Sequence, residues 1–284
     1  MAAVRASGPR AALTSAVLYG VLAVAAVVFL VPFYLLMRNG LSTDLEISSP
    51  DWKLLPESLR FANVTDLFDN TTVPFARSLI NSAFVSVTQT VGAVLVASMA
   101  GYGLARIPYR FANVVFGGIL ATLMIPAAVT FVPSFIIINE IGWLNSYQGL
   151  IVPGMFQAFA AFLFRQYFLG FPIELEEAAR IDGLSTWGTY WRIVVPNSRG
   201  VFAAVASITF IASWNAFLWP LVVGGRDQNK WTVQVALSTL LNAQSPKMTQ
   251  MFAASAIAIL PLLIAFVLLQ RYIVEGVERA GING

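Results

Sequence analysis

The sequence EAARIDGLSTWGTYWRIVVP, residues Glu177–Pro196, stands apart from the rest of the chain. It contains several charged residues, whereas the sequence on either side of it is strongly apolar. Gly183 breaks the segment and Pro196 marks its end, so it predicts two short helices joined by a turn. A polar insertion of this length replaces the short loop that a membrane protein ordinarily has. It therefore indicates a docking site for a soluble partner.

The composition of the whole chain is typical of a membrane protein. Of its 284 residues, 58% are hydrophobic and 11% are charged, whereas a soluble domain carries about 25% charged residues. The sequence contains no cysteine and no histidine, which excludes disulfides, thiolate chemistry, Ser-His-Asp triads and histidine-containing metal sites. The net charge of +3 is too small to indicate nucleic-acid binding. We therefore expect no catalytic residues, no metal site and no cofactor.

Gaps between charged residues locate the membrane spans. Six charge-free windows are 23 to 29 residues long, and a spanning helix needs about 20 apolar residues. The windows are 11–37, 78–105, 111–139, 141–164, 200–225 and 248–270. The predicted fold is therefore an all-α polytopic membrane protein with six transmembrane helices. The more polar gap at 231–246 predicts an amphipathic surface segment.

The distribution of Lys and Arg predicts the orientation of these spans. With the N-terminus inside, ten of these residues fall on inner segments and seven on outer segments. Both termini of this multi-pass cell (inner or plasma) membrane protein are therefore predicted to be cytoplasmic. The first window is too long for the core of a signal peptide, so a retained helix is expected. The predicted regions are 1–77 (first helix and extracytoplasmic loop), 78–274 (five helices, with the polar segment at 171–199) and 275–284 (cytoplasmic tail).

The first half of the polar segment predicts a helix. Pro172 suits the first helical turn, and the acids at 174, 176 and 177 favour the positive end of the helix dipole. Glu176 and Arg180 have the spacing and order of an i,i+4 ion pair. Ala178 and Ala179 are small, so this helix would let another backbone approach closely.

The second half predicts another helix, with Ser185 as its N-cap. An apolar stripe follows at helical spacing, formed by Trp187, Tyr190, Trp191 and Val194. The alternative interpretation is an amphipathic loop that lies on lipid headgroups. Such loops carry Lys and Arg on their polar face, and the acids of this segment would be repelled by anionic lipid. Docking of a protein is therefore favoured.

The spacing of this segment resembles the EAA loop of ABC importer permeases. That loop has Glu-Ala-Ala, three residues, Gly, nine residues, Ile, one residue and Leu-Pro. This chain has Glu177-Ala178-Ala179, then Gly183, Ile193 and Val195-Pro196. Val195 in place of leucine is a mild apolar departure.

The resemblance to the carbohydrate (maltose-type) subfamily extends over nearly the whole chain. Asn81 lies in the motif with which the second span of that family starts. Further similar segments are 124–126, 214–221 and the tail 270–284. Ala216 stands where that family often has an acid or asparagine, so substrate contacts at this position are not carried over.

The resemblance implies an energy-coupling role. In that family the first helix of the loop sits in a cleft of a cytoplasmic ATPase subunit and transmits its rocking to the spans. By position, the ATPase-coupling residues here would be Glu177, Ala178, Ala179, Gly183, Ile193 and Pro196. The tail around 279–284 is similar to tails that also touch the ATPase. The implied partners are a second homologous permease subunit, two ATP-binding cassette subunits, an extracytoplasmic solute-binding protein, membrane lipid and a small solute, without nucleic acid.

Missing residue types narrow the mechanism. The sequence has no G-x-x-x-x-G-K-[ST] motif, so any ATP hydrolysis belongs to a partner chain. The six windows hold no Asp, Glu, Lys, Arg or His, which disfavours a proton- or ion-coupled carrier and suits a neutral, hydroxyl-rich solute. Candidates for lining the solute path are the amides and tryptophans of these windows, namely Asn215, Trp214, Trp219, Gln89 and Gln157. Such residues also serve as interhelical hydrogen-bond partners or interface anchors.

These observations support a leading hypothesis and two alternatives. The leading hypothesis is a non-catalytic permease subunit of an ATP-driven importer, which forms half of the path for a sugar or sugar-like solute. Its outer segment 222–249 would meet the loaded binding protein. One alternative is the same architecture with a non-sugar solute such as a polyol phosphate. The other is a membrane enzyme or a non-transporting scaffold.

Ala97 and Gly101 also have the spacing of a close helix–helix contact.

Overall fold

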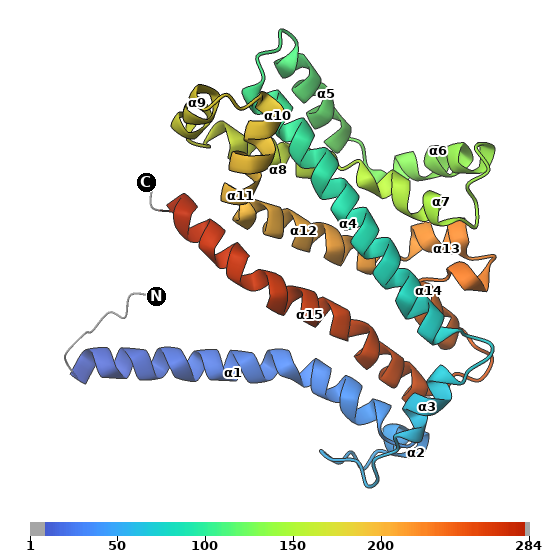
Figure 1. Ribbon diagram of the computed structural model, residues 1–284. Coiled ribbons are helices and arrows are strands. Elements are labelled where there is room, and N and C mark those ends of the chain that lie inside the picture. Colours follow the sequence, from blue (N-terminus) through green and yellow to red (C-terminus); the bar gives the residue numbers. More distant parts are fainter. Residues whose placement is uncertain (1–8, 282–284) are drawn as a thin grey trace. The chain divides into compact units, whose positions relative to one another are not determined.

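The computed structural model describes residues 9–281, and the side chains of residues 13–270 within that range. The predicted ATPase contact of the tail, from Arg279 to Gly284, concerns side chains outside the described residues. All regular structure from 9 to 281 is helical (Figure 1). The α-helices are α1 (Pro9–Gly40), α2 (Asp44–Ser48), α3 (Ala62–Phe68), α4 (Phe75–Arg106), α5 (Ala112–Leu123), α6 (Ala127–Glu140), α7 (Tyr147–Ile151), α8 (Ala158–Leu169), α9 (Ile173–Ile181), α10 (Thr186–Thr189), α11 (Val195–Asn197), α12 (Arg199–Trp214), α13 (Leu218–Gly224), α14 (Val233–Leu241) and α15 (Met248–Gly281). Shorter elements are the 3₁₀ turns η1 (Val152–Met155) and η3 (Gln228–Lys230) and the π-helical turn η2 (Tyr190–Val194).

The chain forms two compact units. One comprises Met1–Asn70 and Leu240–Ile257, and the other comprises Thr71–Thr239 and Ala258–Gly284. The second, which we call the main unit, contains the polar segment 172–197 and the cavity described below. In the first unit, the Asn63 side chain donates to the carbonyl oxygens of Gly40 (2.9 Å) and Ser42 (2.8 Å), which fixes the end of α1. The predicted region boundaries after residues 77 and 274 remain predictions.

By helix length and composition, the described part of the chain contains four to six candidate membrane spans, which agrees with a polytopic membrane protein. Among the residues that the structure describes, four helical stretches are long and apolar enough to span alone, at Leu13–Gly40, Phe75–Arg106, Tyr147–Leu169 and Met248–Gln270. Two further pairs, Ala112–Leu123 with Ala127–Glu140 and Thr186–Asn197 with Arg199–Trp214, are bent by 100° and 80°. Six spans result when each bent pair is counted as one.

The predicted spans at 111–139 and 200–225 are each broken within their apolar window. The window 111–139 divides into α5 and α6 at Pro126, which lacks an amide hydrogen and has an extended backbone (φ −59°, ψ 135°). The window 200–225 divides into α12 and α13 around Ala216. Charge counting could not locate either break, because both lie inside apolar sequence. At such breaks, backbone N–H and C=O groups lose their helical hydrogen-bond partners. Membrane proteins tolerate this where protein or a cavity surrounds these groups.

The core of the main unit is the packing of α4 against α8. A Cβ added at Gly101 would lie 2.6 Å from the Cβ of Phe164 and 2.8 Å from the backbone nitrogen of Arg165. Ala97, one turn earlier, is also buried. The predicted small-residue contact is therefore confirmed. It allows the rings of Phe164 and Phe168 to be fully enclosed between the helices.

Candidate functional site

Residues 172–197, which we call the elbow, fold as the sequence predicts. Gly183 adopts the left-handed conformation (φ +79°) directly after α9. Its amide donates to the Arg180 carbonyl (3.0 Å), and the Leu184 amide donates to the Ala179 carbonyl (2.9 Å). These two bonds form the Schellman end of a helix. Ser185 then caps the next helix by accepting from the Gly188 amide (3.2 Å). The predicted helix–Gly–helix arrangement is thus confirmed.

One face of α9 is held by α4, and its ion pair differs from the predicted one. Glu176 is only 3% exposed, and its Oε1 accepts from the Arg106 Nε at 2.7 Å. The Tyr102 hydroxyl donates to the other carboxylate oxygen (3.3 Å). The predicted Glu176–Arg180 pair is therefore wrong, because the carboxylate turns inward while Arg180 is exposed. Removing one partner of a buried ion pair costs about 3–5 kcal/mol.

The opposite face of the elbow is open and partly apolar. Glu177 and Ala178 are exposed, so the predicted pair of small residues is split, with Ala179 buried. Ile181 is 87% exposed and Trp187 is 60% exposed. Clustered exposed apolar side chains with acids beside them are typical of a protein interface.

The predicted aromatic stripe is divided between interior and surface. Tyr190 and Val194 are fully buried, and the Tyr190 hydroxyl shares a hydrogen bond of 2.7 Å with the Ser98 hydroxyl of α4. Trp187 and Trp191 face outward. The backbone in this region is π-helical, because the Val195 amide donates five residues back to the Tyr190 carbonyl. Of the remaining predicted coupling residues, Ile193 is half-buried, whereas Gly183 and Pro196 are exposed.

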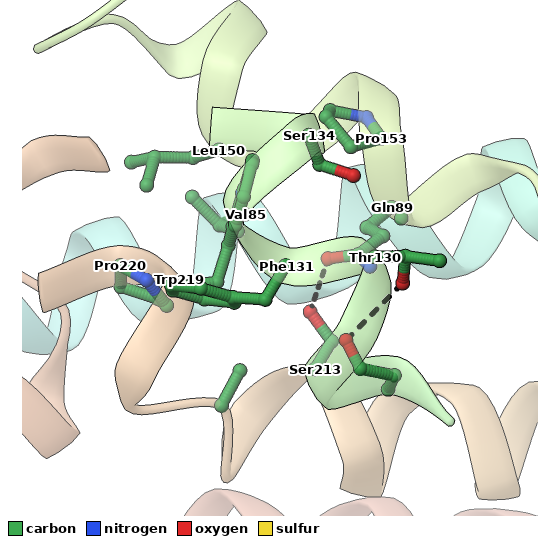
Figure 2. A pocket seen from close by; sticks show the side chains of 13 residues that line it. Val85, Gln89, Thr130, Phe131, Ser134, Leu150, Pro153, Ser213, Trp219 and Pro220 are labelled. Atoms are coloured by element: carbon green, nitrogen blue, oxygen red, sulfur yellow. Dashed lines mark hydrogen bonds between the residues drawn. The ribbon is translucent and has the colours of Figure 1, made fainter. Parts of the chain in front are cut away.

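The main unit also contains a cavity of about 270 Å³ (Figure 2). Figure 2 shows the polar side chains Gln89, Thr130 and Ser134 away from the wall formed by Trp219 and Pro220. The lining residues are Val85 and Gln89 of α4, Ala127, Thr130, Phe131 and Ser134 of α6, Leu150, Pro153 and Gly154, and Ser213, Ala216, Trp219 and Pro220. None of these thirteen residues is charged.

Hydrogen bonds fix the polar and aromatic walls of the cavity. The Ser213 hydroxyl donates to the Gln89 side-chain oxygen at 2.7 Å. The Trp219 indole donates to the Gly149 carbonyl (3.0 Å), and its ring lies edge-on to Phe131, with centroids 5.8 Å apart. A flat aromatic wall opposite amide and hydroxyl groups suits a molecule that has both apolar ring faces and hydroxyl groups.

Two of the five predicted path residues, Gln89 and Trp219, line this cavity. Trp214 is buried and donates to the Ala258 carbonyl of α15 (3.0 Å). Gln157 joins helices, since its oxygen accepts from the Thr209 hydroxyl (3.3 Å). Asn215 is exposed and accepts from the Gln234 amide (3.4 Å). These three lie outside the cavity lining, and their place on a solute path stays a prediction.

Sequence reasoning missed the hydroxyl residues of the cavity. Thr130 and Ser134 are four residues apart on α6, and Ser213 lies at the end of α12. In the sequence, Thr130 and Ser134 are recognisable only as two hydroxyl side chains on either side of Pro133, close to the break at Pro126. Hydroxyl groups in apolar helices often bond only to their own backbone, so this signal was weak.

The connection between α13 and α14 is anchored on the first turns of α4. The buried Asn81 side chain donates to the carbonyl oxygens of Asn229 (2.8 Å) and Trp231 (2.9 Å). Its own oxygen accepts from the Tyr147 hydroxyl (2.8 Å). The Ser82 hydroxyl accepts from the Val233 amide (2.7 Å). The motif residue Asn81 therefore positions a loop.

Comparison with known proteins gives consistent matches over most of the chain. Residues 76–279 match the family described as "Binding-protein-dependent transport system inner membrane component". The arabinooligosaccharides transport system permease protein AraQ of Bacillus subtilis (strain 168) is 33% identical over 249 residues, 88% of this chain and 85% of that protein. The lactose transport system permease protein LacG of Rhizobium radiobacter is 33% identical over 94% of this chain and 96% of its own length. The sn-glycerol-3-phosphate transport system permease protein UgpE of Pectobacterium atrosepticum is 34% identical over 90% of this chain and 92% of its own.

A solved structure shares the fold. It is a bacterial ABC transporter involved in the import of the acidic polysaccharide alginate, and the match has a TM-score of 0.79. The alignment covers 93% of this chain and 98% of the other chain, at 22% sequence identity.

Proposed function

The chain belongs to the family of inner membrane components of binding-protein-dependent transport systems, and we propose that it forms half of an import path for a neutral, carbohydrate-type solute, driven by a separate ATPase that docks on the elbow. Membership of the family makes the chain a multi-pass permease subunit of the inner membrane, and it confirms the resemblance that the Glu177–Pro196 spacing indicated. The ATPase, the orientation and the solute are the proposed parts.

The proposal that an ATPase docks on the elbow rests on the exposed face of the elbow. The buried Glu176–Arg106 pair anchors one side of α9, so the other side is presented in a fixed orientation. That side offers Ala178 and Ile181 for close apolar contact and the carboxylate of Glu177 for a basic partner group. The sequence has no phosphate-binding loop of its own, so the ATPase must be another chain.

The elbow also supports the proposed orientation. An ATPase hydrolyses cytoplasmic ATP, so the elbow and the end of α4 beside it would be cytoplasmic. Arg106 and Arg110, at that end of α4, fit the excess of positive charge on cytoplasmic loops. Both termini then lie in the cytoplasm if six helices span the membrane. The complete importer would add a second permease, two ATPase subunits and an extracytoplasmic binding protein that meets the outer segment 222–249.

The cavity supports a sugar rather than a polyol phosphate. Relatives are named for arabinooligosaccharides, lactose and sn-glycerol-3-phosphate. A phosphate group that enters a low-dielectric site needs a cationic partner, and none of the thirteen lining residues supplies one. Gln89, Thr130, Ser134 and Ser213 instead offer hydrogen bonds to hydroxyl groups, and Trp219 offers a flat apolar wall.

Assembly and uptake together test the proposal. The chain is coexpressed with a candidate ATPase, second permease and binding protein from its own organism, and uptake of radiolabelled lactose, an arabinooligosaccharide and sn-glycerol-3-phosphate is measured in proteoliposomes. We expect ATP-dependent uptake of a sugar. We also expect Glu177→Lys to lower copurification of the ATPase subunit, whereas Glu140→Lys, a charge reversal on exposed α6, leaves it unchanged. Uptake of only the phosphate ester would overturn the substrate class, and absence of uptake with all partners present would support a scaffold.

A further inference from the structure

Helix α4 carries three polar residues on one stripe, four residues apart, and each of them contacts the elbow. Ser98 shares a 2.7 Å hydrogen bond with the Tyr190 hydroxyl. Tyr102 donates to Glu176 at 3.3 Å, and Arg106 pairs with the same carboxylate at 2.7 Å. Residues at i, i+4 and i+8 lie on one side of a helix, so α4 presents a continuous polar surface to the elbow.

The stripe holds both helical parts of the elbow together. The ring of Tyr102 packs against the ring of Tyr190, with centroids 5.1 Å apart, while its hydroxyl contacts Glu176 of α9. Arg106 also donates from Nη2 to the carbonyl of Phe171, just before α9 begins. The start of α9, its middle and the π-helical turn are therefore all tied to the last turns of α4.

The same helix lines the cavity through Gln89 and Val85. Gln89 precedes Ser98 by nine residues, about 13 Å along a helix axis. α4 is unbroken from Phe75 to Arg106, whereas α6 and α13, which also contribute to the cavity lining, follow breaks in the chain. A continuous helix moves as a rigid element, so a displacement at Arg106 is carried to Gln89 without an intervening hinge (Figure 1).

We propose that Ser98, Tyr102 and Arg106 are positioning residues that form the joint through which motion of the elbow reaches the cavity-lining part of α4. This inference rests on the proposed docking of an ATPase on the elbow. It assigns the transmission of motion to one helix and to one buried carboxylate, Glu176. The joint is separate from the docking face, since Glu177 and Ala178 point outward.

The cysteine-free sequence allows a test that needs no knowledge of the solute. Ser134→Cys places one thiol in the cavity wall, and its labelling rate with a membrane-impermeant maleimide is measured in the assembled importer, without nucleotide and after trapping with ATP and vanadate. Glu176→Gln is then added to break the joint. Glu174→Gln, an exposed carboxylate on the same helix, is the matched control.

With an intact joint, trapping should change the labelling rate about tenfold, which is within the usual range of coupling between two sites. Glu176→Gln should reduce this change to less than about twofold while the ATPase subunit still copurifies, and Glu174→Gln should leave it intact. If the assembled Glu176→Gln importer still shows the full labelling change, the proposal of the joint is overturned, whereas the proposed function is unaffected. A parent importer without any nucleotide-dependent change would overturn the proposed function instead.

A second variant covers the case in which Glu176→Gln prevents assembly. The double variant Ser98→Ala/Tyr102→Phe removes both hydroxyl contacts of the stripe and leaves the Arg106–Glu176 pair in place. We expect a reduced labelling change in the assembled importer. The same change as in the parent would overturn the proposal.

Discussion

Two glycines of the elbow should respond oppositely to the same substitution. Gly183 has φ +79°, and a Cβ added to it would meet no atom within 4 Å. Its replacement by alanine therefore causes no clash with other residues, and its cost is that of the strained left-handed backbone, about 1 kcal/mol. Gly188 lies in a helix with ordinary conformation, and its added Cβ would make van der Waals contacts at 3.5 Å. Gly188→Ala should instead be stabilising, by about 0.5 kcal/mol.

Hydrogen exchange of the elbow amides measures this difference locally. The Leu184 amide is bonded to the Ala179 carbonyl at 2.9 Å, so it reports the opening of the end of α9. Its exchange should become about fivefold faster in Gly183→Ala, since 1.4 kcal/mol corresponds to a factor of ten, and should not accelerate in Gly188→Ala. Unchanged exchange in Gly183→Ala, or equal acceleration in both variants, would show that the left-handed conformation of residue 183 does not control the stability of the end of α9.

Three further predictions concern the main unit. Gly101→Ala should destabilise the protein in detergent by about 1–3 kcal/mol because its Cβ would overlap α8, whereas Gly103→Ala, with open space around it, should not; equal thermal unfolding temperatures would contradict the packing argument. Asn81→Leu leaves two loop carbonyls without their donor, so trypsin should cleave after Lys230 about tenfold faster, and an unchanged rate would contradict the anchoring role. Gln89→Leu should raise the KM for sugar uptake about tenfold by removing one cavity hydrogen bond, and an unchanged KM would remove this residue from the path.

The sequence predicted the features that depend on local chemistry. Runs without charge give long apolar helices, and Gly183 and Ser185 give the two ends that meet in the elbow, because left-handed backbone and N-capping are properties of single residues. The close contact at Gly101 was also visible, since small residues four apart permit close helix packing.

Features that depend on distant residues could not be predicted. Glu176 had a suitable partner in Arg180, but its actual partner, Arg106, is 70 residues away in the sequence. The break around Ala216 and the meeting of Ser213 with Gln89 likewise depend on how the helices pack. Local spacing decides which pairs are able to form, whereas tertiary packing decides which of them do form.

Crosslinking from the exposed face of α9 tests whether an ATPase subunit docks on the elbow. A photoreactive cysteine derivative is attached to Ala178→Cys in the assembled importer, with Val24→Cys, on the exposed apolar surface of α1, as the control. We expect a crosslink from position 178 to the subunit that carries the phosphate-binding loop, and none from position 24. An importer that takes up solute with ATP, yet gives no crosslink from position 178 to that subunit, would contradict this docking.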